Sequence, residues 1–548
     1  MSDDPQPGPA LPPHYYHDNF LALLATVERQ YGDLLTAPET DFLERYRSLP
    51  FDAQCLYVRL LSRVGPWFRE SRLDYAELGS ITGAIDALLA AGLATAVSAL
   101  PARELGRLYT RAELVRAFGL PRGGSKTDLL EALDNGSDVV LPFSREGRVV
   151  APAEVEIAAV MSLLFFGNRH QGLTDFVLSD LGVACYYPYR LDREQRLFPS
   201  RQALDEYLAC AALVDTWREA READVGTDLL LELGRGILAF QPVHAASRRR
   251  WCRLCNQLAR ELERLDETAL AADLYAASDL HPARERSVRL LERADRCAEA
   301  LALCEAIEAE PWCEEERDAA RRIRPRLLRR LHGTRAQRQR DAFPSLQLEL
   351  PPVHRGVELA AARRLSDQWE QVHYVENTLM NGLFGLAFWE QIFAPVPGVF
   401  NNPFQSVPSD MYEQGFAHTR ADLLASRMEE LRAADLASLL PAAWRRYQGY
   451  QCRWVNWRYL NEALVAASAR VIPAPHLLAT WERMLFDPGE NRRGFPDLLA
   501  LGGGPGDYCL IEVKGPGDAL QDSQRRWLRF FAEQGMPAQV AWVQWQDD

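Results

Sequence analysis

The feature that most constrains the fold of this chain is a pair of short apolar runs near its end. A stretch through which no strand can continue separates them. The runs are "FPDLLAL" and "YCLIEVK", and "GGGPGD" stands between them. Apolar runs of this length around a glycine-rich turn predict a β-hairpin. Side chains two apart on a strand share one face, so Glu512 and Lys514 on the second arm point the same way. Asp497 lies near the start of the first arm.

The segments that follow extend the hairpin into an α/β domain. "ALQDSQRRWLRFFAEQ" carries its apolar residues at helical spacing, with Leu520, Trp527, Leu528 and Phe531 expected to face inward. "AQVAWVQW" then predicts a third strand.

The lysine at the end of the second arm is unusual for this chain. Of 62 lysines and arginines, only Lys126 and Lys514 are lysines. Lysine is a compact point charge whose pKa responds to burial, whereas arginine stays protonated in any protein setting. We therefore expect a function for Lys514 that arginine cannot perform; the alternative is a surface lysine at a strand end.

Asp497, Glu512 and Lys514 together spell P-D…E-x-K, the signature of restriction-endonuclease-like nucleases. Two carboxylates at one end of a hairpin supply the hard oxygen ligands that Mg²⁺ or Mn²⁺ prefers. Such a cation neutralises charge on a phosphate and activates a water molecule. A movable ammonium group beside it can orient that water, so the pattern predicts phosphodiester hydrolysis.

Length and composition place this site in a multidomain protein. The 548 residues suffice for three or four domains. The 10 cysteines form no paired metal-binding pattern, and the lone Cys252–Cys255 pair reads as two core residues of a helix. No run of uncharged apolar residues is long enough for a membrane span, so we expect a cytoplasmic protein that binds no membrane.

We expect a mainly α N-terminal body followed by a C-terminal α/β nuclease domain with a restriction-endonuclease-like fold. The body would begin with winged-helix/SAP-like modules and continue with tetratricopeptide-like helical repeats. The expected segments are a disordered tail (1–17), a helical DNA-binding domain (18–100), a SAP-like DNA-binding module (101–150), a mostly helical connector (151–250), tetratricopeptide-like repeats (251–345) and the nuclease domain (346–548).

Several basic residues are candidates for contacts with DNA phosphates. "LYTRAELVRAFGLPRGGSKTDLLEAL" contains two capping boxes, Thr110 with Glu113 and Ser125 with Asp128, which predict two short helices. The turn between them exposes Arg122 and Lys126, and this segment resembles the SAP family of DNA-binding modules. The other candidates are Arg69 and Arg72 beside two aromatic residues and, in an arginine-rich stretch at 317–340, Arg321 and Arg322. The net charge of −14 argues against indiscriminate nucleic-acid binding, so these clusters mark local anion-binding faces. The alternative is that the arginine-rich stretch is a solvated helix face.

The C-terminal segment "RRGFPDLLAL…YCLIEVKGPGDALQDSQRRWL" resembles the VRR-NUC nuclease domain, and "HYVENTLMNGLFGLAFWEQ" resembles the part that precedes it in Fanconi-associated nucleases. The SAP-like turn and the helical repeats occur in the order of that family, so the resemblance covers nearly the whole chain. It implies that Glu376, Asp497, Glu512 and the Val513 carbonyl hold the metal. It also implies that Lys514 acts beside them and that Gln524 faces the site from the following helix.

This resemblance implies a structure-selective nuclease that cuts near 5′ flaps and branched junctions, degrades DNA from 5′ to 3′, leaves 5′-phosphate ends and acts in interstrand-crosslink repair. We expect it to bind branched or 5′-flap duplex DNA as a monomer and to work on the bacterial nucleoid. The alternatives are a Holliday-junction resolvase or a restriction-type endonuclease with the same catalytic residues, and a DNA-binding scaffold without catalytic activity.

Overall fold

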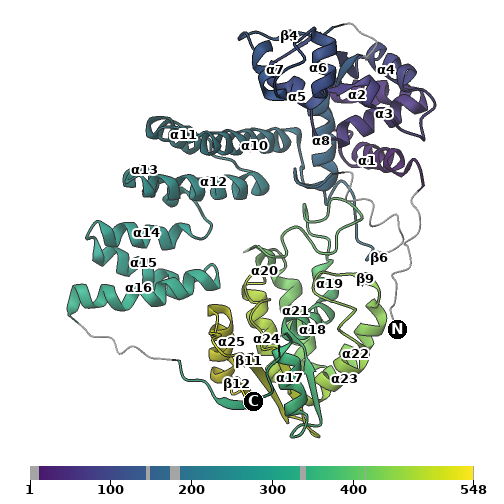
Figure 1. Ribbon diagram of the computed structural model, residues 1–548. Coiled ribbons are helices and arrows are strands. Elements are labelled where there is room, and N and C mark those ends of the chain that lie inside the picture. The colour runs from purple at the N-terminus through teal and green to yellow at the C-terminus, as the bar shows by residue number, and fades with distance from the viewer. Residues whose placement is uncertain are drawn as a thin grey trace. The chain divides into compact units, whose positions relative to one another are not determined.

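A computed structural model describes residues 12–142, 148–172, 185–333, 341–353, 355–413 and 415–546. The chain forms two compact units, one built mainly from residues up to 185 and the other mainly from residues 198–399 and 405–548 (Figure 1). Most of the expected N-terminal tail lies outside the described residues, but the first helix already begins at Tyr15, inside that segment.

In the first unit, helices pack around a small antiparallel sheet of order β1-β5-β2. Its central strand, β5, follows the SAP-like module in sequence yet pairs with strands that precede the module. The N-terminal domain is therefore completed by β5, whose residues we expected at the end of the SAP-like module and the start of the connector. It is also completed by α8, which we expected in the connector and which packs against α1. The elements are α1 (Tyr15–Tyr31), α2 (Ala37–Ser48), α3 (Phe51–Ser62), β1 (Phe68–Arg69), η1 (Glu70–Arg72), α4 (Ile81–Ala90), β2 (Ala94–Ala96), β5 (Val149–Pro152) and α8 (Val155–Phe166).

The SAP-like module contains the two short helices that the sequence predicts. Both capping boxes are formed, at Thr110 with Glu113 and at Ser125 with Asp128. Gly119 ends the first helix with φ 66°, a left-handed conformation that glycine adopts without steric cost. The elements are β3 (Ala99–Leu100), α5 (Ala102–Leu108), α6 (Arg111–Phe118), α7 (Lys126–Leu133) and β4 (Val139–Val140).

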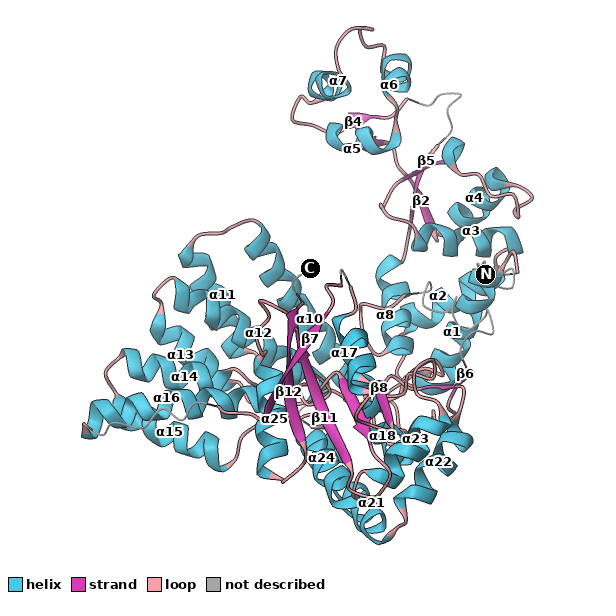
Figure 2. Cartoon of the chain, turned by 60° about the horizontal axis from the view of Figure 1, so that its bottom comes forward, coloured by secondary structure: helices cyan, strands magenta, loops and turns pink. Residues whose placement is uncertain are grey.

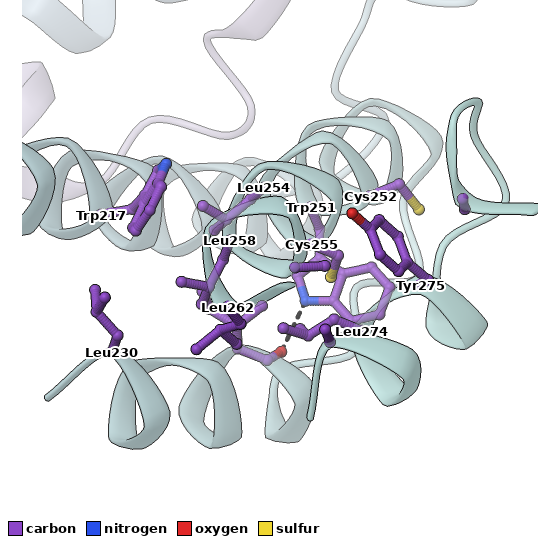
Figure 3. Packing of buried hydrophobic residues seen from close by; sticks show 14 of the residues in the cluster. Trp217, Leu230, Trp251, Cys252, Leu254, Cys255, Leu258, Leu262, Leu274 and Tyr275 are labelled. Atoms are coloured by element: carbon purple, nitrogen blue, oxygen red, sulfur yellow. Dashed lines mark hydrogen bonds between the residues drawn. The ribbon is translucent and has the colours of Figure 1, made fainter. Parts of the chain in front are cut away.

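Successive antiparallel helices form the array at the start of the second unit. Its core contains Trp251, whose indole donates a 2.8 Å hydrogen bond to the Ile237 carbonyl (Figure 3). Cys252 and Cys255 are buried in the same core, as expected for a structural pair. The helices are α10 (Arg201–Glu222), α11 (Thr227–Ala239), α12 (Ala245–Arg264), α13 (Thr268–Ala277), α14 (Ala283–Arg293), α15 (Cys297–Ala309) and α16 (Glu314–His332).

The predicted hairpin is the centre of a five-stranded sheet of order β7-β12-β11-β10-β8 (Figure 2). The hairpin arms β10 and β11 are antiparallel, and β12 runs parallel to β11. Two further strands, β7 and β8, flank the three that the sequence predicts. The strands are β7 (Ser345–Leu350), β8 (Gln371–Tyr374), β10 (Leu498–Leu501), β11 (Tyr508–Lys514) and β12 (Ala538–Trp545).

Helices cover both faces of this sheet. Ile511 and Val513 point to one face and pack with Ala361 and Leu365 of α17 (Val357–Leu365). On the other face, Gln524 of α25 (Asp522–Glu533) contacts Glu512 of β11, and this helix buries Trp527, Leu528 and Phe531 as expected. Leu520, also expected to face inward from this helix, lies before the helix begins and is half-buried. The remaining elements of this unit are α18 (Glu376–Ala387), α19 (Trp389–Ile392), α20 (Phe416–Thr419), α21 (Ala421–Ala433), α22 (Leu436–Tyr447), β9 (Tyr450–Gln451), α23 (Glu462–Val471) and α24 (Ala474–Phe486).

Within the described ranges, no single helix is both long and apolar enough to cross a bilayer. The helices α23 and α24 meet the length and composition requirements only together, as a pair bent by 110° at the break between them.

Candidate active site

The hairpin brings Asp497 and Glu512 to the same end of the sheet. One carboxylate oxygen of Asp497, Oδ2, accepts a 2.9 Å hydrogen bond from the Val513 backbone amide on the opposite arm. The Asp497 carbonyl accepts hydrogen bonds from the backbone amides of Val375 (2.8 Å) and Glu376 (3.0 Å). The start of α18, about 120 residues upstream in sequence, is therefore attached directly to the hairpin.

Lys514 and Gln524 both contact the Glu512 carboxylate. The ammonium Nζ of Lys514 lies 2.9 Å from Glu512 Oε1, and the side-chain amide of Gln524 donates a 2.5 Å hydrogen bond to the same oxygen. Glu512 is 1% exposed and Lys514 8%. The second oxygen, Glu512 Oε2, is buried without a hydrogen-bond partner among the described residues. Lys514 is thus a buried, ion-paired lysine and not a surface lysine at a strand end.

Burial makes the charged forms of both hairpin carboxylates unfavourable. Burial raises the pKa of Asp497 to about 6, although the Val513 amide and Lys514 act in the opposite direction. Burial, and then the charge of Asp497, raises the pKa of Glu512 to about 8 despite the adjacent Lys514. Two close carboxylates in a low-dielectric site need a compensating positive charge, and Lys514 alone does not supply enough of it.

Glu376 is the first residue of α18 and has a strained backbone. Its φ of 35° is positive, a conformation that costs a non-glycine residue about 1–3 kcal/mol. The Tyr374 hydroxyl donates a 2.7 Å hydrogen bond to Glu376 Oε2, and the Asn377 amide donates to Oε1 at 3.3 Å. The charge of Glu376 also raises the pKa of Asp497 and of Glu512, so the three carboxylates share one electrostatic environment.

The chemistry of these donors fits a hard divalent cation. The group offers carboxylate oxygens and a backbone carbonyl, and Glu512 Oε2 is buried and without a partner in the described part of the chain. In their present rotamers, no three acidic, histidine or cysteine side chains among the described residues are close enough to hold one ion. Glu376 is turned toward Tyr374. Tyr374 was not predicted from the sequence; its place two residues before Glu376 is the signal that could have identified it.

Two of the predicted DNA-contacting arginines lie in different surroundings. Arg69 is 4% exposed; its guanidinium donates to Glu113 at 2.8 Å and lies over the Tyr109 ring. Arg72 donates to the other oxygen of Glu113 at 2.7 Å, but its side chain is 51% exposed. These arginines hold the pKa of Glu113 well below its usual range. Arg69 therefore connects the N-terminal domain to the SAP-like module from the inside, while Arg72 remains open to solvent.

The remaining predicted contacts lie on exposed turns and helix faces. Arg122 is exposed in the turn before α7, and the half-buried Lys126 donates a 2.6 Å hydrogen bond from Nζ to the Gly106 carbonyl. Arg321 and Arg322 are exposed on α16. The last arginines of the basic stretch, at 335, 338 and 340, lie outside the described residues.

Three domain families match the chain. The FAN1 HTH domain matches residues 14–95, the Fanconi anemia-associated nuclease SAP domain matches residues 99–144, and the VRR-NUC domain matches residues 432–545. These matches coincide with the winged-helix-like domain, the capped helix pair and the part of the nuclease domain that contains the hairpin.

Curated proteins and solved structures resemble the whole chain. A Fanconi-associated nuclease 1 homolog of Pseudomonas aeruginosa is 36% identical and is aligned over 99% of this chain and 98% of its own length. Human Fanconi-associated nuclease 1 is 24% identical, and the alignment covers 98% of this chain and 63% of the human protein. The present structure superposes on the crystal structure of paFAN1 bound to 5′-flap DNA with a 2-nucleotide flap and a gap, with a TM-score of 0.83 and 36% sequence identity. The match covers 98% of this chain and 100% of that chain.

Proposed function

Since the chain belongs to the Fanconi-associated nuclease family, we propose that this DNA nuclease is structure-selective and cuts branched DNA near 5′ flaps. The observation that carries the proposal is the buried group of Asp497, Glu512 and Lys514 at one end of the hairpin. The related paFAN1 was crystallised with 5′-flap DNA. We further propose that the chain acts as a monomer in interstrand-crosslink repair on the bacterial nucleoid, that it also degrades DNA from 5′ to 3′, and that it leaves 5′-phosphate ends.

We propose that Glu376, Asp497, Glu512 and the Val513 carbonyl hold Mg²⁺ or Mn²⁺. A cation bound there would neutralise charge on the scissile phosphate and lower the pKa of a bound water. Glu512 Oε2, which has no hydrogen-bond partner in the described ranges, supports this assignment, because a buried carboxylate oxygen without a hydrogen bond is costly unless a ligand compensates it. Glu376 would join the set by leaving the Tyr374 hydroxyl, through a change of side-chain rotamer.

Lys514 would act on the water and the phosphate, while Gln524 would position Glu512. The Lys514 ammonium is a compact donor with three protons, and in this buried site it lies within 2.9 Å of a carboxylate. An arginine there would place a larger planar group in the same space and would remain protonated throughout the reaction. The hydrogen bond from Gln524 holds Glu512 Oε1, which leaves Oε2 free to bind the cation.

Shape-selective binding relies on phosphate contacts distributed over several DNA arms more than on contacts with base edges. We propose Arg72, Arg122, Lys126, Arg321 and Arg322 as such contacts. All are at least partly exposed. Arg69 would contribute by holding the N-terminal domain and the SAP-like module together, because its guanidinium is occupied by Glu113.

The experiment is cleavage of a labelled 5′-flap duplex with Mn²⁺, comparing the wild type with Asp497→Ala and Lys514→Arg. Single-stranded, blunt duplex and four-way-junction DNA are parallel substrates. We expect cutting near the flap junction by the wild type and a loss of at least about 100-fold in each variant. Full activity of Lys514→Arg would refute the role of the ammonium group.

The other substrates decide between the alternatives. Symmetric cutting of the four-way junction would favour a resolvase, and cutting of blunt duplex at one defined sequence would favour a restriction-type enzyme. DNA binding without cleavage of any substrate would indicate an inactive scaffold and would refute the proposal.

A further inference from the structure

Beside the candidate active site, the sheet contains a hollow that none of the roles above uses. It has a volume of about 570 Å³, and its lining includes Gln347, Trp542, Gln544 and residues 515–518. Residues 515–518 follow Lys514 directly, and the loop is closed by a 3.0 Å hydrogen bond from the Gly515 amide to Asp518 Oδ2. The hollow therefore begins where β11 ends, at the lysine of the candidate site.

The register of the sheet places Trp542 on the same face as this lysine. In the parallel ladder Lys514 pairs with Trp542, and Trp542 pairs with Gln347 on β7, so β12 lies between β11 and β7 (Figure 2). Paired residues of neighbouring strands share a face and are about 5 Å apart. The alternate residues Ala541 and Val543 pack into the core against α17, which confirms that Trp542 and Lys514 are both on the other face.

Trp542 contributes an aromatic side chain to the lining of the hollow. The residue is partly exposed, and among the described residues no aromatic ring, cation or hydrogen bond engages its side chain. Gln347 and Gln544, both exposed, surround it with amide groups that can donate and accept hydrogen bonds. A flat apolar surface with a polar rim, next to a group that acts on phosphate, matches the chemistry of a nucleobase attached to its phosphate.

On the basis of the proposed nuclease function, we propose that the hollow is a base-binding subsite in which Trp542 stacks on one unpaired nucleobase adjacent to the scissile phosphate. The base has to be unpaired, because a base inside a duplex is already stacked on both faces. Stacking on an aromatic side chain tolerates any base sequence, so the subsite would select for a DNA branch or frayed end and not for a sequence. Lys514 and Trp542 would then position two parts of the same nucleotide.

Binding can be tested without catalysis. Flap DNA carrying 2-aminopurine at single positions on either side of the cut is mixed with the 548-residue chain in EDTA, and the fluorescence of the probe is measured. We expect stacking to quench the probe at one position only, and Trp542→Leu to abolish that quenching. Trp542→Phe should retain most of it, because the ring remains. Tyr459→Leu is the matched control, since Tyr459 is 58% exposed and does not line the hollow.

Cleavage kinetics provide an independent readout. An abasic site at the quenched position should slow wild-type cleavage by about 5- to 150-fold, the range expected from loss of one stacked base. Trp542→Leu should slow cleavage of intact DNA by the same factor and show no further loss on the abasic substrate. The abasic comparison uses the wild type alone and so remains informative if a variant fails to fold.

Several results would overturn the inference. They are equal fluorescence at all positions, quenching that survives in Trp542→Leu, and additive effects of the abasic site and the substitution. If the wild type cuts no DNA, the proposed function fails, and the 2-aminopurine measurement still decides whether Trp542 binds a base.

Discussion

Replacing Glu512 by glutamine should stabilise the metal-free protein. The glutamine carbonyl can accept the hydrogen bonds that Lys514 and Gln524 now donate to Oε1. Its amide group takes the place of Oε2, which has no partner among the described residues. The substitution therefore keeps the size and most hydrogen bonds of the side chain and removes only the charge.

The size of the effect follows from the pKa of Glu512. A rise from the ordinary value of 4.5 to about 8 corresponds to about 5 kcal/mol once the group is ionised in both states. Part of this cost comes from the neighbouring charge of Asp497, and the variant gives up the ion pair with Lys514. We therefore expect a net gain of roughly 2 kcal/mol in the free energy of unfolding, or a few degrees in Tm.

The size of this gain depends on pH. Because the folded-state pKa is raised, the folded protein holds this proton more tightly than the unfolded chain does. The wild type therefore loses stability as pH rises from about 4.5 to about 8, whereas the glutamine variant lacks this loss. The two proteins should unfold alike near pH 4 and differ most above pH 8.

Thermal unfolding in EDTA at pH 5 and pH 8.5 measures this difference. Glu533→Gln, which removes the same charge from an exposed position on α25, serves as the control and should change little. Adding Mn²⁺ should then raise the Tm of the wild type more than that of Glu512→Gln. A variant that is no more stable than the wild type at pH 8.5 in EDTA would refute the idea that this buried charge is uncompensated without metal.

Three further predictions concern proton release and the contacts between elements. Binding of Mn²⁺ near pH 6.5 should release protons, because burial raises the pKa of both hairpin carboxylates. Calorimetry in two buffers of different ionisation enthalpy measures the number of protons released. Identical binding heats in the two buffers would contradict the prediction. Glu314→Ala should lower the free energy of unfolding by about 3–5 kcal/mol, because Arg483 would lose its ion-pair partner in a site where its side chain is only 11% exposed. The two residues now pair at 3.1 Å. Urea unfolding measures the change, and a loss below about 1 kcal/mol would contradict the prediction. Arg69→Ala should destabilise the first unit, because this arginine is buried. Arg72→Ala, at an exposed position, should leave Tm nearly unchanged and reduce the salt dependence of DNA binding. A lower Tm for Arg72→Ala together with an unchanged Tm for Arg69→Ala would contradict these roles.

Local sequence patterns were sufficient for the parts of this fold that depend on neighbouring residues. The turn between two apolar runs predicts the β10–β11 hairpin, and side-chain alternation predicts that Glu512 and Lys514 share a face. The capping boxes at Thr110 and Ser125 predict the starts of α6 and α7. In each case the hydrogen bonds or contacts join residues close in sequence, so the pattern contains the information.

Other features depend on pairings between distant segments, which local patterns do not contain. The strand β5 completes a sheet begun some 80 residues earlier at Phe68, and β7 enters its sheet beside the C-terminal strand β12. The position of Glu376 was expected only from family resemblance, and its backbone hydrogen bond to Asp497 spans about 120 residues.

The burial of Arg69 and the placement of Trp542 beside Lys514 also depend on pairings between segments that are distant in sequence. An arginine next to aromatic residues has the same local sequence whether it faces DNA or pairs with Glu113 from another element. Local patterns in the amino-acid sequence predict which chemical groups the hairpin carries and which way they point. The tertiary structure decided which distant groups surround them, because burial, and with it the raised pKa values of Asp497 and Glu512, arises only when separate segments exclude water together.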